Sequence, residues 1–374
     1  MGYGDTFVKV IQRLCILFAM SIGVASGACA IGGWRVLTTD PMMHTLPITG
    51  LAFFDDVHGW TMTPYELLQT DNGGQTWKPV LLGEERSFLS LCFINPTTGW
   101  IVGSQDQDGD YRALIMHTTD GGKSWDQQEA KSVRILTSVK FGDSSRGWAL
   151  GPKVILYTAD GGNTWEEQYR SKSDEGLMSV ECVSSQRAWA VADNGTVLHT
   201  ENGGVTWVRQ DVGTDASLQR VRFFGEDGWI VGSRGTLLRT RDGGSSWERQ
   251  SLDISNDSVL TDIHIIGERG WLIGSPRTMF HTSDGGQTWQ RQKSPTDRDL
   301  LCLFFLSSHR GQAVKRGRYF ASLTNYSVEC FPSQENTRST TPRASPWGGI
   351  GARGIIGARG GGVVSAADAR VLEA

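Results

Sequence analysis

The chain has 374 residues, which is enough for one large repeat domain, and its formal net charge at pH 7 is −4. So small a charge does not point to nucleic acid or to a membrane surface as a binding partner. The counts of 47 glycines and 14 tryptophans are high, and both residues recur at regular intervals, which indicates that they are structural.

The N-terminus is predicted to be an export signal. Lys9 and Arg13 precede an apolar run, Leu14–Ala25. This run is too short for a comfortable membrane span of about 20 residues but typical of the hydrophobic region of a signal peptide. We therefore expect residues 1–30 to be a signal peptide or an N-terminal membrane anchor, and the mature chain to be exported.

Processing of this segment has more than one possible outcome. Cleavage is expected after Ala28 or Ala30, or the segment stays uncleaved as an anchor. Cys29 ends a sequence that resembles a lipobox, in which case it would carry a lipid. Ser26 stands where a lipobox usually has leucine or valine, which weighs against lipidation.

One motif recurs six times and is here called the box. Its consensus is T-x-[DN]-G-G-x-[ST]-W, and successive box tryptophans are 48, 40, 42, 40 and 42 residues apart. A Gly-Trp or Ala-Trp pair precedes each box. This near-constant spacing predicts a repeat architecture with one supersecondary unit per repeat. The boxes are Thr70–Trp77, Thr118–Trp125, Thr158–Trp165, Thr200–Trp207, Thr240–Trp247 and Thr282–Trp289.

Each unit is predicted to contain four short strands. In the fifth unit, Val221 and Phe223 alternate with Arg220 and Arg222, the period-two pattern of a strand. Trp229–Val231 is a continuous apolar run, as expected for a strand buried on both faces. Thr236–Thr240 is predicted to be a third strand, and Trp247 opens a fourth. Four antiparallel strands in about 40 residues are typical of one β-propeller blade.

The box residues are interpreted as fold elements, not as ligand contacts. Two adjacent glycines allow the positive φ angles of a tight hairpin, and an acidic side chain can accept hydrogen bonds from the turn amides. The tryptophan is expected to bury its ring between neighbouring blades. The predicted structural acidic residues of the boxes are Asp71, Asp120, Asp160, Glu201, Asp242 and Asp284.

The second unit has an enlarged turn, Gln105–Arg112, with alternating aspartates. Such alternation suggests a calcium loop, but Tyr111 stands where an EF-hand has glycine, and no glutamate follows at the twelfth position. A solvated acidic loop is the default interpretation. The sequence therefore predicts no metal site, and it predicts no cofactor.

A seventh unit is expected to combine both ends of the chain. Gly311 falls about one repeat after Trp271, but Tyr326 and Ser327 replace the box glycines. Trp34 precedes Trp77 by 43 residues, one repeat length, and would supply the missing strand. The predicted fold is thus all-β: a seven-bladed propeller of four-stranded antiparallel blades over residues 31–330, its last blade closed by the N-terminal strand, which leaves no exposed sheet edge.

The remaining segments carry weaker signals. Residues 331–374 are rich in Gly, Arg and Ser and are predicted to be a disordered tail. Cys92, Cys182 and Cys302 fall in apolar strand contexts and are predicted to be buried thiols. Cys302 and Cys330 could instead pair in an oxidising compartment.

A basic face is predicted from the turns between second and third strands, which symmetry places around one mouth of the ring. Residues 31–204 carry 13 Lys and Arg against 22 Asp and Glu, whereas residues 205–330 carry 16 against 14. We expect this face to bind an acidic region of a protein partner, and no nucleic acid, in a monomeric protein; simple solvated turns are the alternative. The residues predicted to bind the partner are Lys153, Arg234, Arg277, Arg316 and Arg318.

Six boxes, each preceded by Gly-Trp or Ala-Trp at this spacing, resemble the Ycf48 family of photosystem II assembly factors over roughly residues 31–330. The resemblance implies a seven-bladed, non-enzymatic scaffold. It also implies export to the periplasm or thylakoid lumen, and binding of a membrane protein under assembly, which would be photosystem II in a photosynthetic organism.

The alternative is a sialidase-like glycoside hydrolase or a carbohydrate-binding propeller, because such proteins share the box. Sialidases carry an F/Y-R-I-P motif near the start, and the nearest string here, Val133–Leu136, lacks the aromatic residue and the proline. Glycoside hydrolysis generally needs two carboxylates across a cleft, and no such pair stands out beyond turns and boxes. We therefore expect no catalytic residues.

Overall fold

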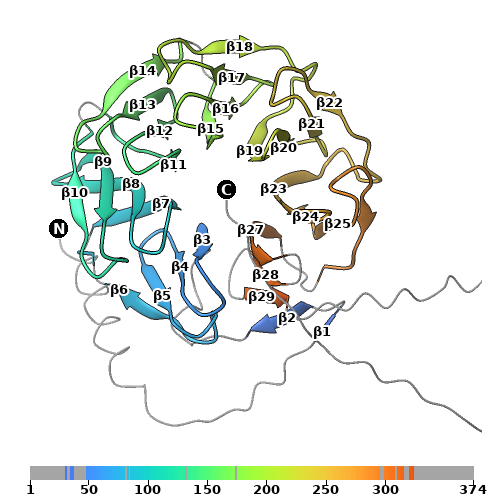
Figure 1. The fold of residues 1–374 in the computed structure, drawn as a ribbon, viewed down its shortest axis with the longest axis horizontal. Helices are drawn as coiled ribbons and strands as arrows, with labels where there is room; N and C mark the ends of the chain where they lie inside the picture. The colour runs from blue at the N-terminus through green and yellow to red at the C-terminus, as the bar shows by residue number, and fades with distance from the viewer. Residues whose placement is uncertain are drawn as a thin grey trace, which may run out of the picture. The chain divides into compact units, whose positions relative to one another are not determined.

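The computed structural model describes residues 30–31, 34–37, 48–80, 82–83, 85–130, 133–172, 175–294, 299–307, 310–315 and 320–323, with side chains only between residues 48 and 305. Within these ranges the chain forms strands and turns, arranged as radial sheets in a ring (Figure 1). The predicted signal segment and the predicted tail lie outside the described residues, apart from Ala30. Among the described residues, no helix is long and apolar enough to cross a membrane.

Six four-stranded antiparallel sheets form the blades, each running in chain order from the ring centre outward (Figure 1). Blade 1 contains β3 (Gly50–Phe53), β4 (Gly59–Met62), β5 (Leu67–Thr70) and β6 (Lys78–Val80). Blade 2 contains β7 (Arg86–Phe93), β8 (Gly99–Gln107), β9 (Asp110–Thr118) and β10 (Asp126–Gln128). Blade 3 contains β11 (Ser138–Phe141), β12 (Gly147–Gly151), β13 (Val154–Thr158) and β14 (Glu166–Arg170).

The other three blades repeat the same order. Blade 4 contains β15 (Leu177–Cys182), β16 (Ala188–Ala192), β17 (Val197–Thr200) and β18 (Val208–Gln210). Blade 5 contains β19 (Leu218–Phe224), β20 (Asp227–Gly232), β21 (Leu237–Thr240) and β22 (Glu248–Arg249). Blade 6 contains β23 (Val259–Ile266), β24 (Arg269–Ser275), β25 (Thr278–Thr282) and β26 (Gln290–Arg291).

The prediction of seven four-stranded blades is wrong. The described residues contain six four-stranded blades, and the sheet that contains both ends of the described chain, here called the closing sheet, has five strands. Its order is β1 (Ala30–Ile31), β2 (Trp34–Leu37), β29 (Phe320–Leu323), β28 (Arg310–Lys315) and β27 (Leu300–Ser307).

The physical reason for the difference is that the N-terminal segment supplies a hairpin and not a single strand. β1 pairs antiparallel with β2, with Ile31 opposite Trp34. β2 pairs in turn with β29, with Trp34 opposite Leu323 and Leu37 opposite Phe320. β27 contacts β23 of blade 6 and β3 of blade 1, so this sheet lies between the sixth and first blades.

The core is built at the contacts between blades. The tryptophan of each Gly-Trp or Ala-Trp pair lies on a second strand and packs against the next blade; for example, Trp148 packs against Leu177 and Val180 of blade 4. Box tryptophans lie beside them, as where Trp125 meets Trp60 edge-to-face with ring centroids 6.1 Å apart. Aromatic burial of this kind contributes strongly to stability, so each blade depends on its neighbour. The second-strand tryptophans, each at most 2% exposed, are Trp60, Trp100, Trp148, Trp189, Trp229 and Trp271.

Candidate functional site: the basic face and the central cavity

Three of the predicted partner-binding residues lie on turns between second and third strands. Lys153 connects β12 to β13, Arg234 connects β20 to β21, and Arg277 connects β24 to β25. These turns bond to the beginnings of the inner strands: the Pro152 carbonyl accepts a hydrogen bond from Leu177 N at 2.8 Å. They therefore surround the mouth at which the inner strands begin, here called the basic face. Arg316 and Arg318 lie outside the described residues.

Two of these turns place arginine in a left-handed backbone conformation. φ is 56° at Arg234 and 48° at Arg277, a region that asparagine and aspartate tolerate better than long side chains do. Blades 2 and 4 have Asp108 and Asn194 in their corresponding turns, with φ of 56° and 55°. Arg234 Nη1 lies 2.7 Å from Asp215 Oδ1, but both side chains are more than half exposed, so this ion pair contributes little to stability.

The box hairpins use their polar groups internally. In the fifth box Asp242 Oδ1 accepts hydrogen bonds from Thr240 Oγ1 at 2.6 Å and from Ser246 N at 2.9 Å. A hydrogen bond from the Ser246 hydroxyl, followed by that of Thr240, lowers the pKa of Asp242 to about 2. Thr240 Oγ1 also accepts from Gly244 N at 2.9 Å. The box carboxylate thus stabilises its own turn.

In the first and fourth boxes this role belongs to an asparagine and not to the acidic residue predicted. Asn72 Oδ1 accepts from Thr76 N at 2.9 Å, whereas Asp71 binds Lys78 Nζ at 2.7 Å. Asn202 Oδ1 accepts from Thr206 N at 3.0 Å in the same way. Glu201 instead faces Arg187, with a separation of 3.4 Å between Oε2 and Nε.

A repeated glutamine links each of four blades to the next, a feature that the sequence analysis missed. Gln168 Nε2 donates to the Gly203 carbonyl in the next box at 2.8 Å, while Gln168 Oε1 accepts from Trp148 Nε1 at 3.0 Å. The recurring Trp-x-x-Gln at the end of the boxes was the available signal. The glutamines that donate to a box glycine carbonyl are Gln128, Gln168, Gln210 and Gln250.

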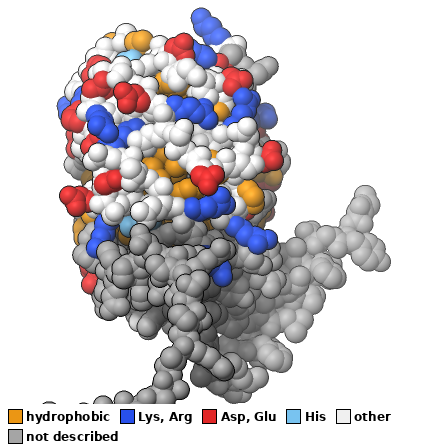
Figure 2. Space-filling model, turned by 90° about the vertical axis from the view of Figure 1, so that its right-hand side faces the viewer, with side chains coloured by type: hydrophobic (Ala, Val, Ile, Leu, Met, Phe, Trp, Pro, Cys, Tyr) orange, Lys and Arg blue, Asp and Glu red, His pale blue; other side chains and the backbone are white. Residues whose placement is uncertain are grey.

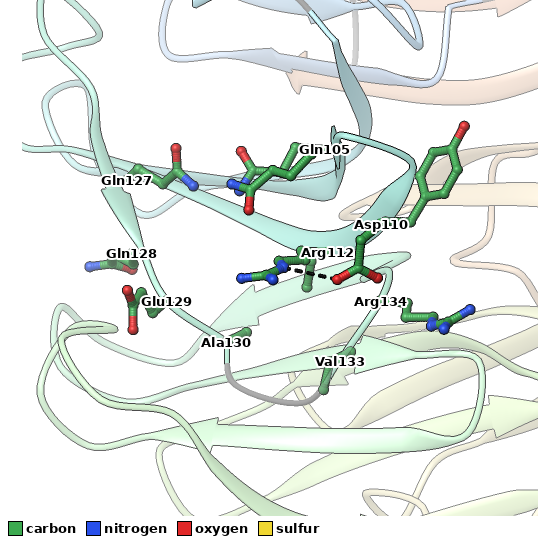
Figure 3. Close-up of a pocket in the computed structure, with 12 residues that line it drawn as sticks. Gln105, Asp110, Arg112, Gln127, Gln128, Glu129, Ala130, Val133 and Arg134 are labelled. Atoms are coloured by element: carbon green, nitrogen blue, oxygen red, sulfur yellow. Dashed lines mark hydrogen bonds and ion pairs between the residues drawn. The ribbon is translucent and has the colours of Figure 1, made fainter.

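The enlarged turn of blade 2 is a projecting hairpin of β8 and β9. Beside it lies a polar cavity of about 490 Å³, bordered by the hairpin and by residues 127–130 and 133–134 (Figure 3). Arg112 Nε lies 3.3 Å from Asp110 Oδ2 within this cavity, and Tyr111 is 56% exposed. No cluster of three or more potential metal ligands occurs among the described residues.

A second cavity, of about 290 Å³, follows the central axis between the inner strands. One side of its wall carries a charged cluster. Asp262 Oδ1 lies 3.5 Å from both Arg220 Nε and Arg222 Nε, and Glu181 Oε2 lies 3.1 Å from Arg222 Nη1 and 3.4 Å from Lys140 Nζ. Burial raises the pKa of Asp262, but Arg220 and Arg222 outweigh it, so the net shift is downward.

Small residues also line this cavity. Gly50, Ala52, Ser90 and Ser138 line it. Cys92 and Cys302 also border the cavity as free thiols. Burial raises the pKa of Cys302 to about 12, so it is unreactive at neutral pH. Cys182 is the third free thiol of the described residues. Cys330 lies outside them, so its predicted alternative pairing remains a prediction.

Charge on the outer side of the ring is mixed. Lys, Arg, Asp and Glu side chains intersperse over the side that carries β22 and β25 (Figure 2). Such a surface has no single-sign field with which to attract a charged partner.

The repeated sheets and box hairpins define the chain as an Asp-box β-propeller. The family model "Photosynthesis system II assembly factor YCF48" matches residues 32–133, 127–216 and 206–297. The chain therefore belongs to this family, as its box spacing predicted.

Curated relatives agree with this assignment. The chain is 34% identical over 168 residues to photosystem II stability/assembly factor HCF136, chloroplastic, of Cyanidioschyzon merolae. This alignment covers 41% of this chain and 36% of that protein. It is 28% identical over 123 residues to photosystem II assembly lipoprotein Ycf48 of Synechococcus sp. strain CC9902. That alignment covers 29% of this chain and 34% of the lipoprotein. The alignments thus span about a third of the length of these relatives.

Solved structures show the same fold. A structure described as YCF48 bound to D1 peptide aligns with a TM-score of 0.65 at 23% identity, covering 80% of this chain and 99% of that one. The GH74 xyloglucanase of Xanthomonas campestris aligns with a TM-score of 0.63 at 11% identity, covering 78% and 53%. Both identities are low, so these similarities concern the fold alone.

Proposed function

We propose that this protein is a non-catalytic scaffold that binds a protein partner, a photosystem II subunit under assembly, through its basic face. Family membership is the observation that carries the proposal. Two relatives are named as photosystem II assembly factors, and one structural neighbour is described with a bound D1 peptide. On this proposal, a D1 peptide is the first partner to test.

The basic face supports this proposal through its backbone. A long side chain in the left-handed region costs roughly 1 kcal/mol relative to a residue that tolerates it, so Arg234 and Arg277 are locally unfavourable for folding. Their retention is accounted for if their charges bind a partner. Arg316 and Arg318 belong to the same proposed surface, because the sequence places them between β28 and β29.

The carboxylates support a role without catalysis. A glycoside hydrolase needs a carboxylic acid that keeps its proton near neutral pH, and a second carboxylate across the cleft. The two acidic side chains that line the axial cavity, Glu181 and Asp262, are both ion-paired to Arg222. Asp262 has a lowered pKa, the reverse of what a general acid requires. We expect no release of product from a fluorogenic sialoside or from xyloglucan oligosaccharides.

The proposed location is an exported compartment, the periplasm or the thylakoid lumen. One relative is named a lipoprotein and another chloroplastic, which agrees with a chain carried out of the compartment of its synthesis. Attachment through residues 1–30, by lipid at Cys29 or by an uncleaved anchor, would hold the propeller close to a membrane-embedded partner.

Charge reversal tests the proposed surface. Changing Arg234, Arg316 and Arg318 together to Glu should abolish capture of a D1 peptide or of native photosystem II intermediates, and wild-type capture should weaken as salt is raised. A matched control changes Lys123, Arg146 and Arg241 to Glu, which alters net charge equally around the box hairpins. If the basic-face variant captures its partner with wild-type affinity at low salt, the proposed surface is incorrect.

A further inference from the structure

We propose that the axial cavity binds one carboxylate group, held by Arg220 and by the hydroxyls of Ser90 and Ser138, which line the same cavity. The carboxylate is either the chain terminus of a protein partner or a free small carboxylate; the first source rests on the proposed function. The site is distinct from the basic face because its residues lie on the inner strands.

The first argument is a charge imbalance inside the ring. Lys140, Arg220 and Arg222 supply three cations, and Glu181 and Asp262 supply two carboxylates. His264, which also lines the cavity, is neutral at pH 7, because burial and then the charge of Arg222 lower its pKa to about 4. Burial raises the pKa of Cys92 and Cys302, so these thiols are neutral as well. The side chains of Lys140, Arg220 and Arg222 keep 26%, 31% and 20% of their surface exposed, so one further negative charge can approach them and balance the cluster.

The second argument is the geometry of Arg220. Its Nε atom is buried without a hydrogen-bond partner among the described residues, because Asp262 Oδ1 lies 3.5 Å away and outside hydrogen-bonding geometry. The carboxylate oxygens of Asp262 already accept hydrogen bonds from two backbone amides, Leu303 N and Ile263 N, each at 3.0 Å. The guanidinium therefore has donor capacity left, and planar guanidinium groups bind carboxylates in a bidentate manner.

The third argument is the small-residue wall. Ser90 Oγ accepts a hydrogen bond from Val139 N, and Ser138 Oγ accepts one from Val180 N, each at 3.3 Å. Because each hydroxyl already accepts from an amide, its own hydrogen is left to donate, and both residues line the cavity. Short side chains here leave the space that a carboxylate needs. Ser90, Ser138 and Arg220 thus supply donors from three inner strands, β7, β11 and β19.

Small probes test this site without any protein partner. Isothermal titration of the full chain should show binding of N-acetyl-Gly-Ala as the free acid and at least tenfold weaker binding of its C-terminal amide. Arg220→Lys should weaken binding about tenfold by losing the bidentate contact, and Ser138→Ala about fivefold by losing one hydrogen bond. Arg170→Lys on the outer strand β14 serves as the matched control and should bind like the wild type.

The outcomes separate the two sources and the two proposals. Saturable binding of acetate with the same sensitivity to Arg220→Lys assigns the site to a free carboxylate, and binding of the peptide acid alone assigns it to a chain terminus. Equal binding of acid and amide, or no binding of acetate or peptide acid, overturns the carboxylate site. Partner capture by the basic face is measured separately, so its failure would leave these titrations intact. Ser90→Ala replaces Ser138→Ala if the latter loses the fold.

Discussion

The same blades carry two kinds of turn that differ in how they use their polar groups. The box hairpins are nearly identical six times over and bond their polar groups internally, as Asp242 does to Thr240 and Ser246. The turns of the basic face vary from blade to blade, with Asn194 in one blade and Arg234 in the next, although both residues share a left-handed backbone. Turns that hold the fold are uniform, whereas the opposite turns can vary and are available for recognition.

The largest expected difference between the two kinds of turn concerns two glycines with similar φ angles. Gly122 in a box and Gly109 in the opposite turn of blade 2 have φ of 79° and 86°. A Cβ on Gly122 would lie 2.4 Å from the Trp60 ring, whereas a Cβ on Gly109 would meet nothing within 4 Å. Gly122→Ala should lower the free energy of unfolding by about 2–5 kcal/mol, and Gly109→Ala by about 1 kcal/mol. Urea denaturation of both variants would measure the difference; equal losses would show that backbone strain, not packing against Trp60, sets the cost.

Acid should lower the stability that the box hairpins contribute to the fold. The Ser124 amide, and then its hydroxyl, lower the pKa of Asp120 to about 2, and Asp242 is lowered similarly. Because the folded pKa lies below the unfolded value of 3.8, these boxes bind fewer protons when folded. Their contribution to stability is complete above about pH 4 and declines as the pH falls toward 2.

A melting series between pH 2 and pH 6 would measure this decline. Asp120→Asn with Asp242→Asn should give a shallower acid dependence with little loss at pH 6, because asparagine serves the same role at Asn72 and Asn202. A double variant as acid-sensitive as the wild type would show that Asp120 and Asp242 do not control the loss of stability in acid.

The smallest expected effect lies on the basic face. Arg234→Asn should raise the free energy of unfolding by about 0.5 kcal/mol, because asparagine tolerates the left-handed backbone, while it weakens partner capture. Arg241→Asn, in a box, is the control for loss of one exposed charge and should leave capture unchanged. If Arg234→Asn destabilises the protein, its exposed bond to Asp215 matters more than its backbone strain.

Local chemistry explains what could be predicted from the sequence. Gly-Gly pairs and tryptophans recur at a fixed period, so strands, box hairpins and the β-propeller class followed from residues a few positions apart. The hairpin of β1 and β2 could not be found, because Ala30–Ile31 is too short to show periodicity. The Trp-x-x-Gln recurrence was visible, but its partners, such as Gly203 for Gln168, lie 35 residues away.

The axial cavity was beyond sequence reasoning for a similar reason. Arg220 and Arg222 were recognised as the polar face of a strand, and strands have two faces that the sequence does not distinguish inside a ring. Only the closed ring brings Lys140, Glu181 and Asp262 toward them from three other blades. Alternation predicted a half-exposed strand, and ring closure turned its exposed side into a cavity wall.

The pairing of β2 with β29 has a kinetic consequence. Trp34 lies opposite Leu323, almost 290 residues further along the chain, so β2 cannot pair with β29 until the last propeller strand has been synthesised. Contacts between residues so distant form slowly because the loop-closure entropy is paid first. The blades in between can stack as their residues are synthesised, while one edge of β2 stays unpaired until β29 is made. Completion of the closing sheet thus reports that the whole propeller, from Trp34 to Leu323, has been synthesised.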